Sequence, residues 1–414
     1  MNCAKLLSRK QTGYRANPIC SLHHVISSCN SLTFCVAHIL QQELFPLLQS
    51  CVGPLSGQMQ LLALVISLAP LERMVSVRRA ATGRPAKDRA ALATAFMAKA
   101  ILNLPTTRDL ISRLRVDEAL RKFCGWSSVR ALPHESKFSR AFAEFAATEL
   151  PQQLHEAVIA ATQKERLIGH IARDSTAIPA RERFPEEAHK EKQKQKAVKQ
   201  RRNKHAPGRF ARAKAAERGT RIQRQRHQQL PRMLSELPRQ CDIGAKKNSQ
   251  GNEQYWRGYK LHLDVADGQV PISAVLTSAS VHDSQVAIPL MTLTSQRVVH
   301  LYELMDSAYD ADDIHAHSRQ LNHVPIIAPH PRRGTKKSSQ LPKVFPDKPT
   351  PQLTWAQQNR YKERTMSERV NARLKDEFGA SHLRVRGAAK VMAHLMFGVL
   401  ALTVDQWMRM GKTG

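Results

Sequence analysis

The segment YWRGYKLHLDVADGQVPISAVLTSAS, residues 255–280, contains two strand patterns separated by a turn. Apolar and polar side chains alternate from Tyr255 to Val265, which predicts a strand with one buried face. The dipeptide Asp267-Gly268 is typical of a hairpin turn, and the residues from Val270 to Ser280 predict the returning strand. The middle of the chain is therefore expected to form an antiparallel hairpin.

Apolar runs on both sides of this hairpin predict three further buried strands, over residues 167–172, 298–304 and 323–328. Helical patterns separate and follow these strands, over residues 284–293, 311–321, 354–378 and 388–410. A strand, a hairpin and then alternating helices and strands predict a mixed α/β sheet.

Residues 37–165 predict helices instead of strands. Asp88 can cap one of them, and Thr106 with Asp109 resembles a capping box for the next. Three phenylalanines at spacings of four and three form a core stripe: Phe138, Phe142 and Phe145. The short helices between Thr106 and Trp126 suit either a DNA-reading helix-turn-helix or an ordinary helix bundle. Residues 1–36 carry no periodic signal and are expected to be irregular.

The chain has 414 residues and a net charge of +30, from 64 Lys and Arg against 34 Asp and Glu. So large a surplus favours a polyanionic partner, with nucleic acid first and an acidic membrane surface second. No run of about 18 consecutive apolar residues occurs, and the nearest, Leu61–Ala69, is too short to span a membrane. Seven cysteines without a Cys-x-x-Cys pair predict a reduced cytoplasmic protein without a structural zinc site.

Much of this charge lies in one segment. Residues 181–240 contain 19 Lys and Arg against 6 Asp and Glu, with many Gln and almost no large apolar residues. Such a composition is not expected to bury a core. The segment is either a solvated linker or, as we favour, a basic insertion that binds the phosphate backbone without reading sequence.

A second charged pattern lies near the C-terminal end, in YKERTMSERVNARLK, residues 361–375. On an α-helix Tyr361, Arg364, Glu368 and Lys375 fall within roughly 60° of one another. One face then carries an aromatic hydroxyl, two cations and a carboxylate, which suits a site that holds a metal and grips phosphates. The alternative is a solvated helix face with ordinary i, i+4 ion pairs.

Two aspartates upstream favour the first interpretation. Asp174 and Asp306 each follow an apolar run that predicts a strand. If these strands are neighbours, both carboxylates emerge at one edge of the sheet, and Glu368 on a nearby helix can complete a cluster of three. Three oxygen donors suit Mg²⁺ or Mn²⁺, and two such ions can promote phosphodiester displacement.

These motifs resemble those of the DDE-class bacterial insertion-sequence transposases, in the superfamily that includes insertion sequences four and five. The matching residues are Asp174 in D-S-T, Asp306 in D-S-A-Y-D, and Glu368 within Y-x2-R-x3-E-x6-K. Further similarities are Gly258-Tyr259-Lys260 with His262, His282-Asp283, and Gly387 before the closing helix. The resemblance covers roughly residues 80–410. The basic segment is long and polar for its place in that family.

The resemblance implies a helical DNA-binding domain over residues 37–165 and an RNase H-like catalytic domain over residues 166–410, with a basic insertion at 181–240. It implies that Asp174, Asp306 and Glu368 bind two divalent metal ions. DNA contacts are expected from Tyr361, Arg364, Lys375 and Lys260.

The family's reaction is cleavage at the element's ends followed by attack of the freed 3′-hydroxyl on target DNA. A homodimer on double-stranded DNA, in the cytoplasm and near the nucleoid, is expected. The alternatives are a metal-dependent nuclease that only hydrolyses DNA, and a non-catalytic DNA-binding protein derived from a transposase.

Deleting residues 181–240 is expected to weaken binding to unrelated DNA and to flatten its salt dependence. The reason is that each lost phosphate contact removes about 0.9 from the slope of log affinity against log salt. Gel-shift titrations at a series of salt concentrations measure this slope. An unchanged slope would show that the segment is a solvated linker.

Overall fold

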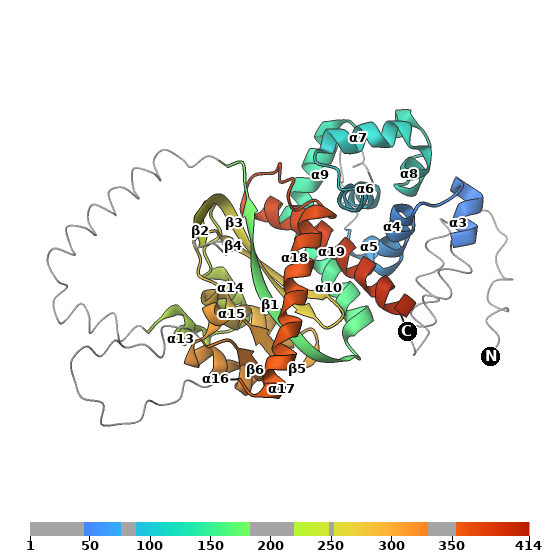
Figure 1. The fold of residues 1–414 in the computed structure, drawn as a ribbon. Coiled ribbons are helices and arrows are strands. Elements are labelled where there is room, and N and C mark those ends of the chain that lie inside the picture. The colour runs from blue at the N-terminus through green and yellow to red at the C-terminus, as the bar shows by residue number, and fades with distance from the viewer. Residues whose placement is uncertain (1–44, 76–87, 183–218, 248–251, 330–352, 414) are drawn as a thin grey trace, which may run out of the picture.

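The computed structural model describes residues 45–75, 88–182, 219–247, 252–329 and 353–413. These residues form a six-stranded mixed sheet with helices on both faces, and a further group of helices at one end (Figure 1). The irregular segment expected over residues 1–36 lies outside the described ranges, as do residues 183–218 of the basic segment. The predicted mixed α/β sheet preceded by helices is confirmed.

The sheet has the order β2-β3-β1-β5-β6, and β4 pairs with β3 on the same side as β2. Strands β1, β5 and β6 are parallel to one another, and the other pairings are antiparallel. The strands are β1 (Leu167–Pro179), β2 (Asp242–Lys247), β3 (Glu253–Ala266), β4 (Val270–Ser278), β5 (Val299–Met305) and β6 (Val324–Ile327). Strand β2, with the sequence DIGAKK, lacks the alternation that predicts a strand and was missed.

Strand β3 corrects the expectation of one buried face. From Tyr259 onward both of its faces are buried, so that His262 and Asp264 are as enclosed as Leu261 and Leu263. The reason is its central position, with α18 (Thr365–Asp376) packed on one face of the sheet and α15 (Ser284–Ser295) on the other. At Gly258 a side chain is excluded, because φ is +152° and a Cβ atom would lie 2.1 Å from the carbonyl oxygen of Ile178.

The single helix predicted over residues 354–378 is interrupted. The structure has α17 (Trp355–Tyr361), a 3₁₀ turn η6 (Lys362–Arg364) and then α18. The hydroxyl groups of Thr365 and Ser367 donate to the carbonyl oxygens of Lys362 and Arg364, three residues earlier, at 3.1 and 2.8 Å. Such side-chain bonds compete with helical ones and favour a tightened turn. Tyr361 therefore does not share one regular helix with Glu368.

The opposite face is covered by α15 and by three shorter helices, α13 (Arg221–Gln225), α14 (Leu230–Ser235) and α16 (Asp312–Gln320). Two of these belong to the basic segment, which was expected to bury no core. Met233 and Leu237 are each only 3% exposed, in clusters with residues of α15. The missed signal is the helical spacing of Leu230, Met233, Leu234 and Leu237. A deletion that tests phosphate binding alone must therefore be limited to residues 183–218.

Helices make up the N-terminal part of the described chain, as predicted. They are α3 (Phe45–Val52), α4 (Gly57–Leu68), α5 (Leu71–Met74), α6 (Arg89–Ile101), α7 (Thr107–Val116), α8 (Glu118–Phe123), η3 (Val129–Ala131), α9 (Glu135–Ala147) and α10 (Leu150–Gln163). The Asp88 cap of α6 and the Thr106–Asp109 capping box of α7 are both present. The phenylalanine stripe of α9 is buried around Phe96, with ring centroids 4.8–6.3 Å apart.

The helix α19 (Ala388–Thr413) joins the two parts. It packs on α4, α6, α9 and α10 and also on β4, so that one hydrophobic core extends from the N-terminal helices to the sheet (Figure 1). By length and hydropathy Ala388–Met410 could cross a membrane, but 67% of that window is buried inside the protein. Its apolar character is therefore explained by core packing.

A buried ion pair links the central strands. Arg173 of β1 is 1% exposed and donates from Nε and Nη2 to the Asp264 carboxylate of β3, at 2.8 and 2.7 Å. The same Nη2 atom lies 3.6 Å from Glu303 Oε1 of β5. One cation thus compensates two carboxylates that are almost fully enclosed.

Replacing Arg173 by Met is expected to lower the free energy of unfolding by about 3–5 kcal/mol, because two buried carboxylates lose their counter-charge. Arg166→Met is the control, since its ion pair with Asp267 joins side chains that are 33% and 26% exposed. That variant should lose about 1 kcal/mol or less. Denaturant titrations measure both. Equal losses in the two variants would contradict a special role for the buried pair.

Candidate active site

Asp174 and Asp306 lie side by side because of the register between β1 and β5. The last parallel pair is Ala172 with Leu304, and each aspartate lies two residues beyond its member of that pair. Asp306 directly follows β5, as predicted, and accepts a hydrogen bond from the amide of Ala308 at 2.9 Å. Asp174, expected just past a strand, lies inside β1, which runs on to Pro179 paired with β3 alone.

Both carboxylates lie in a largely buried environment. Burial is the main cause that raises the pKa of Asp174 to about 6, and the charge of Asp306 adds to it. Burial also raises the pKa of Asp306, together with the charge of Asp283. All three aspartates act on Tyr309, a buried residue whose hydroxyl has no hydrogen-bond partner among the described residues. The site therefore concentrates negative charge in a poorly solvated place.

Helix α18 reaches this site through Asn371, a residue that the sequence analysis missed. Its Nδ2 donates to Asp174 Oδ2 at 3.1 Å. Its Oδ1 is buried and lacks a hydrogen-bond partner among the described residues. The available signal was its spacing, since Asn371 lies three residues after Glu368 and so on the same side of the helix.

Glu368 lies in the first turn of α18 and is half exposed, at 52% of its side chain. Arg364 Nη2 donates to Glu368 Oε1 at 2.6 Å, which is the i, i+4 ion pair of an ordinary helix surface. The same guanidinium is in electrostatic range of Asp174 and Asp306 and lowers the pKa of both. Arg364 therefore lies among all three predicted carboxylates, and Tyr361 lies next to it.

Lys375, in the last turn of α18, also faces this region. It is partly buried, which lowers its pKa, and it interacts with Asp174. Lys246 of β2, another residue that sequence analysis missed, acts on Asp174, Asp306 and Lys375. Two lysines from separate elements thus border the aspartates.

Lys260 has a different environment from the other predicted DNA-binding residues. Its Nζ donates to the carbonyl oxygen of Val281 and to Asp283 Oδ1, both at 2.9 Å, and its side chain is 14% exposed. Asp283 is at the same time 3.9 Å from His262 Nδ1. The His282-Asp283 motif, in the turn between β4 and α15, therefore brings a fourth carboxylate to this end of the sheet.

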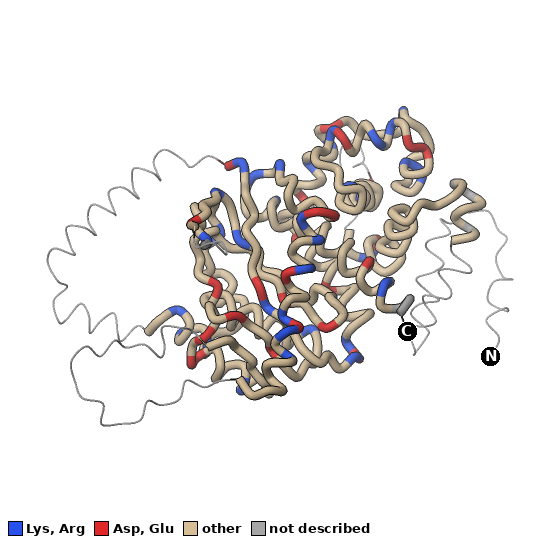
Figure 2. The backbone as a smooth tube through the Cα atoms, in the orientation of Figure 1, with Lys and Arg blue, Asp and Glu red and all other residues tan. Residues whose placement is uncertain are grey.

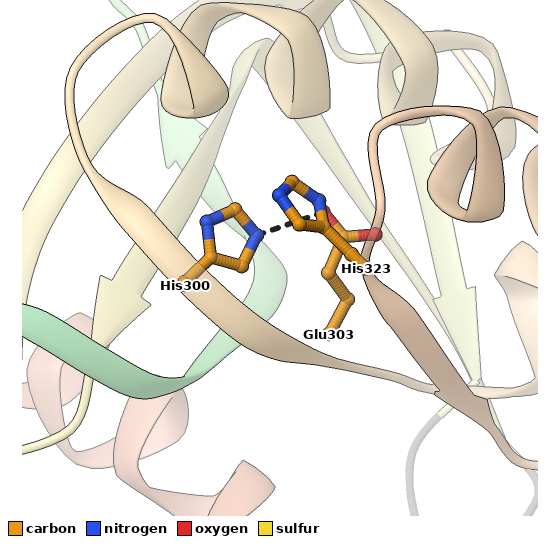
Figure 3. A group of neighbouring side chains, drawn as sticks. All are labelled: His300, Glu303 and His323. Carbon is orange, nitrogen blue, oxygen red and sulfur yellow. Dashed lines mark hydrogen bonds and ion pairs between the residues drawn. The ribbon is translucent and has the colours of Figure 1, made fainter.

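Asp174, Asp306 and Glu368 do not form a tight oxygen cluster. Within the described ranges, one group of three possible metal ligands has atoms within 4.8 Å of one another: His300, Glu303 and His323 (Figure 3). His300 Nε2 and His323 Nδ1 lie 3.3 and 3.5 Å from Glu303 Oε1. Burial would raise the pKa of Glu303, but Arg173 and the two histidines hold it well below its ordinary value. Since Arg173 already supplies a cation, we interpret this group as part of the buried ion-pair network.

Comparison with known families identifies two domains. Residues 219–404 match the family described as "Transposase DDE domain", and residues 56–144 match the family described as "Transposase domain (DUF772)". The first match includes Asp306 and Glu368 and begins after Asp174. No curated protein and no solved structure matches the chain significantly.

The two matches agree with the architecture, since one covers helices α4 to α9 and the other covers the sheet from β2 onward with its flanking helices. Together they are typical of transposases encoded by insertion sequences, and the mixed sheet is the RNase H-like core of the DDE domain. The chain therefore contains the two domains that are typical of DDE insertion-sequence transposases, a family of nucleic-acid-processing enzymes.

Proposed function

We propose that this transposase binds the ends of its insertion sequence, cleaves the DNA there and joins the freed 3′ ends to target DNA. The observation that carries the proposal is the register-matched pair Asp174 and Asp306, whose pKa values burial raises, next to the helix that bears Glu368. These three residues are the proposed catalytic carboxylates and the proposed ligands of two divalent cations.

The chemistry of the donor set fits such cations. DDE transposases use divalent metals, and the paired aspartates form a poorly solvated negative site that a hard cation would stabilise. The unpartnered Oδ1 of Asn371, beside Asp174, is a further oxygen of the kind that Mg²⁺ or Mn²⁺ accepts. When bound, the metals would activate the attacking oxygen and stabilise the leaving one.

Arg364 holds Glu368 at the surface of α18. It is bonded to Glu368 but also lies in electrostatic range of both aspartates. We propose that Arg364 exchanges Glu368 for a DNA phosphate, to which a guanidinium binds well. Glu368 is then free to turn toward Asp174 and Asp306 together with the metals.

DNA is proposed to lie over α18. Tyr361, Arg364 and Lys375 border the aspartates on this side, whereas Lys260 has most of its donor capacity committed to Asp283 and Val281. Figure 2 shows acidic and basic residues interspersed over the described elements. Residues 183–218 carry 13 Lys and Arg against 4 Asp and Glu, and we propose that they add sequence-independent phosphate binding. A homodimer that holds both ends of the element is part of the proposal.

Asp306→Asn and Glu368→Gln are each expected to lower Mg²⁺-dependent cleavage of the element's own end by more than about 100-fold. This exceeds the usual loss for residues that only orient a ligand. DNA affinity, measured by gel shift on the same end, should stay at the wild-type level. Glu363→Gln is the matched control, since Glu363 is an exposed glutamate in the adjoining turn η6 and is not among the predicted carboxylates. If Glu368→Gln cleaves like the wild type, Glu368 is no metal ligand.

The same assay separates the alternatives. A nuclease that only hydrolyses would cut the end but would not join a labelled 3′ end to a second duplex. A non-catalytic DNA-binding protein would do neither, although it would still shift the DNA in a gel. Joining by the wild type, lost in both carboxylate variants, is the result that we expect.

Arg364→Ala and Lys375→Ala are each expected to weaken binding of the element's end by about 10-fold, the contribution of one charge-assisted hydrogen bond. Joining should fall in parallel, while Mn²⁺ binding measured by calorimetry persists because the carboxylates are intact. Arg369→Ala is the control, since Arg369 is exposed on the same helix and bonds to Thr365. Equal effects of all three changes would indicate an ordinary charged helix surface.

A further inference from the structure

A pocket of about 270 Å³ lies between the N-terminal helices and the segment that leads into α19. In this part of the molecule α6 and α9 pack on α19 (Figure 1). Aromatic rings from three helices line its inner wall: Phe96, Phe142 and Phe397. The start of α7 and residues 384–390 form its polar side. The pocket therefore combines an apolar wall with a basic rim.

Lys99 is the residue that makes this pocket unusual. It lies in α6, lines the pocket and is only 7% exposed. No described residue forms a hydrogen bond or an ion pair with its ammonium group. Burial lowers its pKa to about 8, and the nearest opposing charge is that of Asp109. That carboxylate is already engaged, since Asp109 Oδ2 accepts from both the amide and the hydroxyl of Thr106. The pocket thus contains a largely buried cation that does not form an ion pair with its nearest carboxylate, that of Asp109.

Other side chains on the pocket wall also carry a positive charge. Arg384, Arg386 and Lys390 line it, and no Asp or Glu is among its lining residues. Thr106 and Thr107 place the N-terminal end of the ten-residue helix α7 at the pocket. A helix N-terminus presents free amide groups and partial positive charge, which favour anions.

We propose that this pocket binds one phosphate group of the DNA backbone, held by Lys99 and the arginines of the rim, with the adjoining deoxyribose against the phenylalanines. The inference deepens the proposed function, since it names where the N-terminal helices contact DNA. Asn103, after α6, bonds to the carbonyl oxygen of Asp376 at the end of α18, at 2.7 Å. A strand that passes Lys375 near the carboxylates can therefore continue to the pocket.

The first test compares Lys99→Met with Lys164→Met in the full-length protein. Methionine retains the length and packing of Lys99 but removes its charge, and Lys164 is an exposed lysine that does not line the pocket. With unrelated duplex DNA and no divalent metal, the slope of log affinity against log salt should fall by about 0.9 in Lys99→Met alone. Equal slopes in the two variants would overturn the proposal.

The second test uses the wild-type protein, so that a folding defect in a variant cannot decide the result. Lysine acylation is followed by mass spectrometry with no ligand, with inorganic phosphate and with duplex DNA. DNA should slow modification of Lys99 several-fold relative to Lys164, and phosphate should do so more weakly. If DNA binds and is cleaved while Lys99 reacts at its original rate, the pocket proposal fails and the proposed function survives. If phosphate protects Lys99 but the protein neither binds nor cuts DNA, the proposed function fails and an anion site remains.

Discussion

The parallel pairing of β1 with β5 is the constraint on which the proposed active site depends. Because Ala172 is opposite Leu304, Asp174 and Asp306 stand at the same level of the sheet and on the same side. A shift by one residue would turn either carboxylate to the other face. Arg173 and Glu303 lie on these two paired strands. Together with Asp264 they form a buried ion-pair network, and this register brings the Arg173 and Glu303 charges together. The buried ion pairs therefore favour the strand register that aligns the two aspartates.

The sequence predicted most of this architecture because its signals are local. Alternation over 255–265, the Asp267-Gly268 turn and the caps at Asp88 and Thr106 each depend on a few neighbouring residues, and each is confirmed. Two features were predicted wrongly, the first for a non-local reason and the second for a local one. Burial of both faces of β3 follows from helices far along the chain, and the 3₁₀ turn before α18 arises from side-chain bonds that compete with the helix.

The residues of the candidate site also divide into those that the sequence could predict and those that it could not. The order of Asp174, Asp306 and Glu368 and the strand-end position of Asp306 could be inferred from spacing. The bond between Asn371 and Asp174 could not, because those residues are 197 positions apart. Nor could the isolation of Lys99, which depends on α7 and on the segment before α19. A lysine in an alanine-rich helix carries no sign of what surrounds its ammonium group. Tertiary context decides which charges are compensated and which are available to a ligand.

The position of α19 also affects the timing of folding during synthesis. This 26-residue helix is made after every other described element, yet α4, α6, α9, α10 and β4 all pack on it. At ordinary ribosomal rates its synthesis takes about 1–5 s, during which the apolar surfaces of those elements are uncovered. A chain that stops before Ala388 would keep them exposed and would be prone to aggregation and proteolysis. Partial translation products should therefore be removed instead of persisting as folded fragments.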